Sequence, residues 1–268
     1  MSMQSPDTAG PDVMGLGVYR ADPSLKGKLR RRLVRLVDRK PARGRLLRPM
    51  ITFAFDDTPA SAVRDGAPIL ESRGVKGTYY FCAGLAGEHG HMGQYATRED
   101  MIRVAEAGHE VGCHTYSHLD CGQGTGVAVA DDLDLNAAIL SDWGVTEHLS
   151  TFAYPYGDVG FPGKHEAAQR FALSRGLHHG LIEAGSDLNQ APSVGIEGED
   201  GEAMAHSWLG KAAERKAWLI LFTHGVEDVP TAFGCSKGAL GRLLDEALAK
   251  GFEVVTAAEG ARRMGAAA

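Results

Sequence analysis

Carboxylates and imidazoles stand at the ends of two short apolar runs in this sequence. Asp56 and Asp57 follow "MITFAF", and His114 and His118 follow "HEVGC". Two adjacent carboxylates repel one another unless a cation or a proton lies between them. The four-residue spacing of the histidines would put both rings on one side of a helical turn. Carboxylate and imidazole ligands together suit Zn²⁺ or a similar divalent ion and leave positions open for water and substrate.

Each of these motifs has a simpler explanation when it is taken alone. Asp57 or Thr58 could cap a helix that begins near Pro59. A pair of histidines is more often incidental polar surface than a metal site. Three ligands at the ends of two strands are much harder to dismiss, and we therefore predict a metal site here.

Two further motifs also follow apolar runs. In "FAYPYGD", Pro155 and Gly157 indicate a turn whose backbone N–H groups could face a substrate, although an ordinary Pro-Gly turn has the same pattern. In "LILFTHG", His224 ends a strand that looks buried. A solitary histidine at a strand end is often structural, but this one arrives at the same predicted edge as the other motifs.

The elements that must position these residues alternate between strands and helices from Met50 onward. Helical patterns cover residues 60–72, 97–107 and 237–250, and Thr97 with Asp100 resembles a capping box. The predicted strands are "MITFAF", "KGTYYF", "HEVGC", "STFAY", "LHHGLI", "WLILFT" and "FEVVT". Seven strands that alternate with helices predict a parallel α/β sheet, either open or closed into a barrel. In a barrel, the chemistry gathers at the carboxyl ends of the strands.

The ordered set "FAFDD", "HTYSH", "AYPYG" and "LILFTHG" resembles the polysaccharide deacetylases of carbohydrate esterase family 4, the NodB-homology domain. The resemblance covers about residues 50 to 260. It implies a distorted (β/α) barrel of about seven parallel strands. It also implies a divalent metal, with Zn²⁺ expected from the ligand set, held by Asp57, His114 and His118.

The resemblance further implies a role for each remaining motif. Asp56 matches the general base of the family, His224 its general acid, and the backbone N–H of Tyr156 its oxyanion donor, with Pro155 and Phe222 beside the substrate. The expected reaction is metal-dependent N-deacetylation of N-acetylated sugar units in a poly- or oligosaccharide, with release of acetate. The expected substrate contains N-acetylglucosamine, as in bacterial exopolysaccharide or adhesin biosynthesis of the holdfast type.

The sequence departs from the family at the residues that support the base. Ala153 stands where the family has an arginine that orients the base carboxylate, and Arg170 and Arg175 are candidates to replace it. Phe222 stands where the family prefers leucine beside the acetyl methyl group, which predicts a pocket of different shape.

The family motif that braces the acid histidine is not legible in this sequence. Asp187 in "GSDLN" is a candidate for its aspartate, and a helix cap or turn residue is the alternative. We interpret His178 and His179 as polar surface at a strand end rather than as ligands.

The charge is unevenly distributed along the chain. The whole sequence has a net charge of -6, but residues 26–48 hold eleven basic residues and a single acid, Asp38. The remaining 17 basic and 33 acidic residues suit a protein that does not bind nucleic acid. We therefore divide the chain into a lead with a basic amphipathic helix, residues 1–49, and a deacetylase domain, residues 50–268.

Leu25, Leu29, Leu33 and Leu36 recur at helical spacing within this basic segment. Residues 25–40 could dock on anionic lipid headgroups at the inner leaflet of the membrane. Alternatively, the leucines pack on the barrel, or they form an oligomer contact.

The remaining features predict a cytoplasmic protein. No secretory signal is visible at the N-terminus, and no apolar run approaches the roughly 20 residues that span a bilayer. The four cysteines lack any CxxC pairing, which favours reduced thiols. A cytoplasmic deacetylase would meet N-acetylated glycans as soluble precursors or as lipid-linked intermediates.

Two other functions remain open. A small-molecule hydrolase of amide or ureide C–N bonds could use the same domain, although intact Asp57, His114 and His118 argue against a metal-free version. A non-catalytic carbohydrate-binding protein is the other, but binding alone needs neither Asp56 nor His224.

Overall fold

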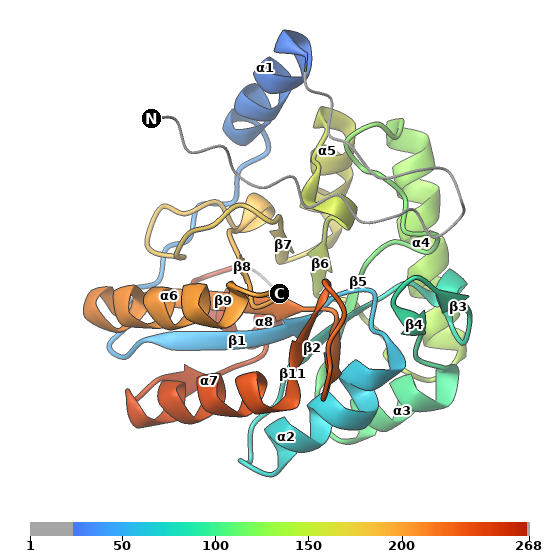
Figure 1. Cartoon of the computed structure of the whole chain (residues 1–268). Helices are drawn as coiled ribbons and strands as arrows, with labels where there is room; N and C mark the ends of the chain where they lie inside the picture. The colour runs from blue at the N-terminus through green and yellow to red at the C-terminus, as the bar shows by residue number, and fades with distance from the viewer. Residues whose placement is uncertain (1–23, 267–268) are drawn as a thin grey trace.

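A parallel sheet forms the centre of the computed structural model, which describes residues 24–266 (Figure 1). Its strands run in the order β7-β6-β5-β2-β1-β9-β8, and β12 pairs with the first residues of β1. Every pairing in this sheet is parallel. The strands are β1 (Met50–Phe55), β2 (Thr78–Phe81), β5 (Glu110–Cys113), β6 (Thr151–Ala153), β7 (Leu173–Arg175), β8 (Val194–Gly195), β9 (Trp218–Thr223) and β12 (Glu253–Val254).

The sheet curls until its two edges approach one another. Arg175, the last residue of β7, forms a parallel bridge with Ala191, three residues before β8 begins. The predicted distorted (β/α) barrel of about seven parallel strands is therefore confirmed.

Helices cover the outer side of the sheet (Figure 1), whereas α8 packs through Ala257 and Ala261 against the cluster inside it. Thr97 and Asp100 form the capping box that was predicted, and α3 starts there. The predicted helix at residues 60–72 includes a π-helical turn, Ala62–Gly66, ahead of α2. The helices are α1 (Leu25–Leu33), α2 (Ala67–Glu71), α3 (Arg98–Glu106), α4 (Gly126–Asp142), α5 (Phe161–Arg170), α6 (Gly201–Arg215), α7 (Lys237–Ala249) and α8 (Ala257–Arg263). Two small sheets pair β3 (His89–Gly90) with β4 (Gly93–Gln94), and β10 (Gly225–Glu227) with β11 (Gly234–Ser236).

Successive side chains of a strand point to opposite faces, and this alternation divides the core in two. Ile51, Phe53 and Phe55 of β1 belong to the large cluster beneath the helices. Met50 and Ala54 belong to a second cluster inside the curled sheet. Each fully buried side chain of this size contributes about 1.5–3 kcal/mol to folding. The same alternation decides which residues enter the barrel at the strand ends.

One predicted strand is wrong. The segment "LHHGLI" is a loop in the structure, and the strand of this region, β7, lies just before it. Gly176 follows β7, and Leu177 is partly exposed, so the apolar residues of the loop do not continue into the sheet. Only Ile182 makes a strand-like contact, an antiparallel bridge to Trp218.

The basic segment begins with α1, capped by the side chain of Ser24, and continues through a 3-10 turn, Val34–Leu36. Residues 1–23 of the predicted N-terminal lead lie outside the described residues. All four cysteines are buried and free of disulfides. Among the described residues, every helix is too short or too polar to cross a membrane.

Candidate active site

Strand alternation carries several of the predicted residues to one end of the barrel interior. Asp56 continues the inward series of β1 that includes Met50 and Ala54. His224 likewise continues the inward series of β9, after Phe222. Both residues directly follow the carboxyl ends of neighbouring strands, where the site of a parallel barrel is expected.

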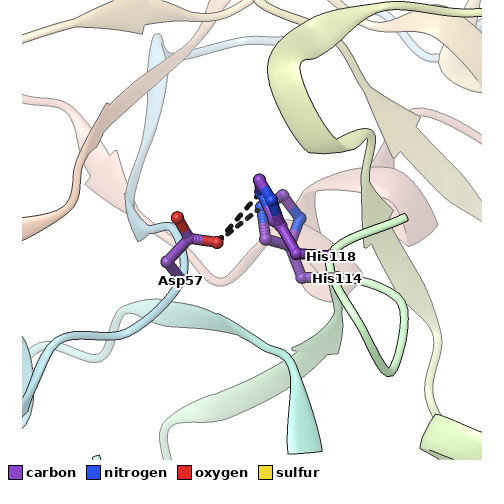
Figure 2. A group of neighbouring side chains, drawn as sticks. All are labelled: Asp57, His114 and His118. Atoms are coloured by element: carbon purple, nitrogen blue, oxygen red, sulfur yellow. Dashed lines mark ion pairs between the residues drawn. The ribbon is translucent and has the colours of Figure 1, made fainter. Parts of the chain in front are cut away.

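Three side chains converge on one small space beside these strand ends. The Oδ1 atom of Asp57 lies 3.3 Å from Nε2 of His114 and 3.2 Å from Nε2 of His118. One ligand atom from each residue lies within 4.8 Å of the other two. Figure 2 shows the carboxylate of Asp57 facing both imidazole rings.

This arrangement fits a divalent cation. The Nδ1 atom of His114 lies 2.8 Å from the carbonyl oxygen of Ala153, so the ring donates its proton there and turns the lone pair of Nε2 toward Asp57. The Oδ1 atom of Asp57 is buried and has no hydrogen-bond donor. An acceptor lone pair that faces a carboxylate oxygen is repulsive unless a cation lies between them.

The electrostatics of the three residues agree with this fit. Burial alone would raise the pKa of Asp57, but the nearby imidazoles of His118, His114 and His224 hold it well below its ordinary value. Burial lowers the pKa of His118 to about 4. Both shifts keep the residues in the forms that ligate metal, an ionised carboxylate and a neutral imidazole.

The loop that carries the histidines brings them together without the helical turn that their spacing suggested. Thr115 and His118 both have positive φ angles, of 63° and 59°, and they bend the chain back on itself. Asp132 of α4 holds the bend, because its carboxylate accepts the backbone N–H groups of Tyr116 and Ser117 at 2.8 and 3.0 Å.

Backbone strain gathers at this site. Asp57, Thr58 and Tyr156 also have positive φ angles, between 47° and 58°. In the described chain only Asp38 and Lys216 are further non-glycine residues of this kind. Left-handed backbone costs a non-glycine residue about 1–3 kcal/mol, and such strain clusters where function requires it.

Asp56 has a buried cationic partner. Its Oδ1 atom accepts a short hydrogen bond from Nη2 of Arg175, and both side chains are almost completely buried. The guanidinium lies between the rings of Tyr80 and Phe222, 4.9 Å from the centroid of each. Arg175 comes from β7, the strand beside the one that carries Ala153.

Arg170 and Arg175 were the two candidates to replace the arginine that the family resemblance expects at position 153. The prediction is wrong for Arg170. This residue ends α5 on the surface and pairs with Asp134 at 2.8 Å and with Glu166 at 2.7 Å. Alternation explains the difference, because Arg175 shares the inward face of β7 with Leu173, whereas Arg170 precedes the strand.

The carboxylate of Glu197, which was not predicted from the sequence, holds His224. The Nδ1 atom of His224 forms a short hydrogen bond with Glu197, and its Nε2 atom lies 3.9 Å from Oδ2 of Asp57. Burial lowers the pKa of His224, but the carboxylate of Glu197 outweighs burial and raises the pKa above its ordinary value. Glu197 lies two residues after β8, a two-residue strand too short to show a period in the sequence.

The prediction that Asp187 braces His224 is wrong. The carboxylate of Asp187 accepts from Nζ of the buried Lys164 at 2.7 Å and from the backbone N–H of Lys40 at 2.8 Å. It also caps the short turn that begins at Leu188. Asp187 therefore has the turn-capping role that was its alternative.

The turn after β6 forms one wall of the site. Pro155 is buried, and the ring of Tyr156 meets the ring of His118 edge-on, with centroids 4.4 Å apart. Phe233 lies on the other side, with its ring 6.0 Å from His224 and 5.2 Å from His91. Neither Phe233 nor His91 was predicted, since both lie in loops beside short two-residue and three-residue strands.

Part of this chain matches a known protein family in sequence. Residues 43–170 match the family model described as polysaccharide deacetylase. No curated protein matches the chain.

Several solved structures share the fold at low sequence identity. The Bc1960 peptidoglycan N-acetylglucosamine deacetylase is 18% identical with a TM-score of 0.57, over 81% of this chain and 89% of its own. A family 4 acetyl xylan esterase from Clostridium thermocellum, solved with a cobalt ion, is 16% identical with a TM-score of 0.53, over 78% and 89%. BA3943 from Bacillus anthracis, described as a family pseudoenzyme, is 16% identical with a TM-score of 0.55, over 84% and 70%. At identities of 16–18%, the similarity to these structures shows a shared fold and no more.

Proposed function

We propose that this chain is a polysaccharide deacetylase of the NodB type, which removes acetyl groups from N-acetylated sugar units of a poly- or oligosaccharide; the match of residues 43–170 to the polysaccharide deacetylase family model supports this. One observation carries the proposal. Three ligand atoms lie within 4.8 Å of one another, and the strand ends that carry them also carry a buried carboxylate, Asp56, and an imidazole held by a carboxylate, His224, which lies 3.9 Å from Asp57. Hydrolysis of an amide needs both a base and an acid, whereas binding needs neither.

Asp57, His114 and His118 would hold a divalent ion, and Zn²⁺ suits this ligand set. When bound, the ion would supply a Lewis acid that polarises the acetyl carbonyl and acidifies a neighbouring water.

Asp56 acts as the general base that takes the proton from the attacking water. Arg175 keeps the carboxylate ionised and fixes its direction, because a buried carboxylate without a cation would take up a proton instead. Since both side chains are packed inside the barrel, the base is oriented before the substrate arrives.

The backbone N–H of Tyr156 donates to the oxygen on which charge develops during the attack. His224 then protonates the departing nitrogen, since an amide does not readily expel an unprotonated amine. Glu197 keeps a proton available for this step by raising the pKa of His224. The products are acetate and a free amino sugar.

We further propose that the natural substrate contains N-acetylglucosamine and belongs to exopolysaccharide or adhesin synthesis. One structural relative is named as an N-acetylglucosamine deacetylase and another as an acetyl xylan esterase, so both N-acetyl and O-acetyl substrates belong in the test. A histidine poised to protonate nitrogen favours the amide, because an alcohol leaves more easily than an amine.

The decisive experiment measures acetate released from N-acetylglucosamine oligomers by the full chain, stripped of metal and refilled with Zn²⁺. We expect activity to disappear on stripping and to return with Zn²⁺ in the wild type, but to stay absent in Asp57→Ala. The melting temperature gives an independent readout, because an ion that binds only the folded state raises the wild-type value and not that of the variant.

Each alternative predicts a different result. A small-molecule hydrolase would release product from small amides and none from the oligomers. A non-catalytic relative would bind the oligomers equally well in the wild type and in Asp56→Asn, with no acetate from either. If divalent ions do not change the melting temperature of the wild type, the proposed metal site is refuted.

A further inference from the structure

The outward face of α1 carries a row of exposed leucines. Leu25 and Leu29 are 85% and 55% exposed, and Leu36, in the following turn, is 71% exposed. The buried residues of this segment, Gly27 and Val34, lie on the opposite side. One alternative predicted that the leucines pack on the barrel. It is wrong, because the leucines face away from the barrel. Single exposed leucines are ordinary, but a continuous row marks a surface that is covered by something else.

The leucine row is flanked by cations that have no ionic partner among the described residues. Lys26, Lys28, Arg32 and Arg35 are exposed, and none of them pairs with an acidic group in residues 24–266. α1 contains five basic residues and no acid. A leucine row between rows of cations is the pattern of a helix that lies in the surface of an anionic membrane, with its apolar side chains below the headgroups.

We propose that α1 and the turn after it, residues 25–36, dock this protein on an anionic lipid surface. A second copy of the chain is a poorer occupant, because pairing two such helices through their leucines would bring two uncompensated sets of cations together. An uncharged membrane would satisfy the leucines but leave the cations without counter-charges. The contact is peripheral, since none of the described helices can cross a bilayer.

The helix is fixed to the rim of the candidate active site. Arg30 pairs with Asp158 at 2.6 Å and also donates to the carbonyl oxygen of Gly122. Gly122 lies four residues after His118, and Asp158 lies two residues after Tyr156, so Arg30 joins the two loops that carry these residues. Nζ of the buried Lys164 donates to the carbonyl oxygen of Val34 at 2.9 Å and holds the end of the segment. Docking through α1 would therefore bring the rim of the site close to the lipid surface.

Vesicle sedimentation with the full chain tests this proposal. We expect binding to vesicles of phosphatidylcholine mixed with phosphatidylglycerol, weak binding to phosphatidylcholine alone, and release from the mixed vesicles at high salt. Lys26→Glu, Lys28→Glu and Arg32→Glu together should weaken binding by about 100-fold or more, since each cation near the surface contributes about fivefold. Leu25→Ser, Leu29→Ser and Leu33→Ser together should abolish sedimentation while the charge is unchanged.

Matched controls come from elsewhere on the surface. Lys250→Glu reverses a charge at the end of α7, and Val229→Ser removes an apolar side chain that is 88% exposed. Neither should change vesicle binding. α7 lies on the far side of the molecule from α1 (Figure 1).

The proposal fails if the protein binds both kinds of vesicle equally, binds neither, or binds equally well with the leucines replaced. It also fails if light scattering shows a dimer that the leucine variants dissociate, because the partner is then a second copy. All altered side chains are exposed, so unchanged circular dichroism will show that the variants fold. Acetate release from soluble oligomers is measured separately, and its outcome does not affect the docking result.

Discussion

Arg175 reaches Asp56 from a strand adjacent to the one where the family carries its arginine. The exchange works because β6 and β7 are neighbours with Ala153 opposite Arg175, so both positions face the same interior. Replacing a large side chain by alanine on one strand leaves room for a large side chain from the next. Phe222 and Tyr80 fill the space on either side of the guanidinium. Asp56 therefore has a buried cation beside it, supplied from position 175.

Replacing Arg175 should therefore damage both stability and catalysis. We expect Arg175→Met to lower the free energy of unfolding by about 3–5 kcal/mol, because it leaves Asp56 buried without a cation. It should also lower kcat at least 100-fold, since the base loses its orientation and its charge. Arg170→Met, at the surface candidate, should change kcat little. Denaturant unfolding and acetate release check both variants, and equal effects of the two changes would refute the role of Arg175.

Glu197 positions His224 in a comparable way. Glu197→Gln removes the charge next to Nδ1 and should lower kcat about 10- to 100-fold with KM nearly unchanged, because the acid acts after the substrate has bound. Asp187→Asn tests the other carboxylate and should lower stability through Lys164 while kcat stays within about threefold. Steady-state kinetics on the same oligomer distinguishes them. An unchanged kcat in Glu197→Gln would exclude it as the positioning residue.

Among the elements, β2, β5 and α2 meet at a buried histidine far from the site. Nδ1 of His109 accepts the backbone N–H of Gly77 at 3.0 Å, and its Nε2 lies 3.1 Å from Oε1 of Glu71. The ring must therefore be neutral, with its proton on Nε2. Burial lowers the pKa of His109, and the neighbouring Glu71 only partly offsets this.

This lowered pKa predicts a dependence of stability on pH. The unfolded chain binds a proton at position 109 near the ordinary histidine pKa of about 6.5, while the folded protein does so only at lower pH. The contribution to stability is therefore complete above that value and is lost as the pH falls toward the folded pKa.

His109→Gln should remove this part of the pH dependence. At pH 8 we expect it to lower the free energy of unfolding by about 1–3 kcal/mol through the lost hydrogen bonds. At pH 5 its deficit relative to the wild type should be smaller. Urea unfolding at both values provides the measurement, and a deficit that grows with acidity would contradict the assignment.

Across the whole molecule, the N-terminal helix and the turn after it are joined to the barrel through three polar contacts and through Val34, which is buried in the large core cluster. Arg30 contributes two of them, and Lys164 contributes a third. Because the leucines of α1 face away from the barrel and Val34 lies in the turn after the helix, α1 itself has few apolar contacts that could replace these bonds. The attachment of α1 should therefore depend on single residues.

Arg30→Ala tests this dependence. We expect faster amide hydrogen exchange in residues 25–36, while the sheet stays protected, because local opening no longer has to break the contacts to Gly122 and Asp158. Lys28→Ala, at an exposed position without an ion pair in the described chain, serves as the control and should leave exchange unchanged. Hydrogen exchange followed by mass spectrometry resolves the segment. Equal exchange in the two variants would mean that Arg30 does not hold the helix.

Features that depend on a local pattern could be predicted from the sequence. Long apolar strands such as β1 and β9 appear as continuous runs because both of their faces are buried, and Thr97 and Asp100 marked the start of α3. The candidate ligands Asp57, His114 and His118 were identified because each directly follows a strand or its loop. The order of the four motifs along the chain carried the resemblance to the polysaccharide deacetylases.

The pairings between segments distant in sequence became visible in the folded chain alone. Asp56 and Arg175 are 119 residues apart, and His224 and Glu197 are 27 apart with α6 and β9 between them, so no local period links them. The strands that supply these partners, β7 and β8, have three and two residues, too few for alternation to be visible. The direction in which the leucines of α1 face could not be predicted from the sequence either. An amphipathic pattern shows that a helix has an apolar face, and only the packed molecule shows whether that face meets the core or the solvent.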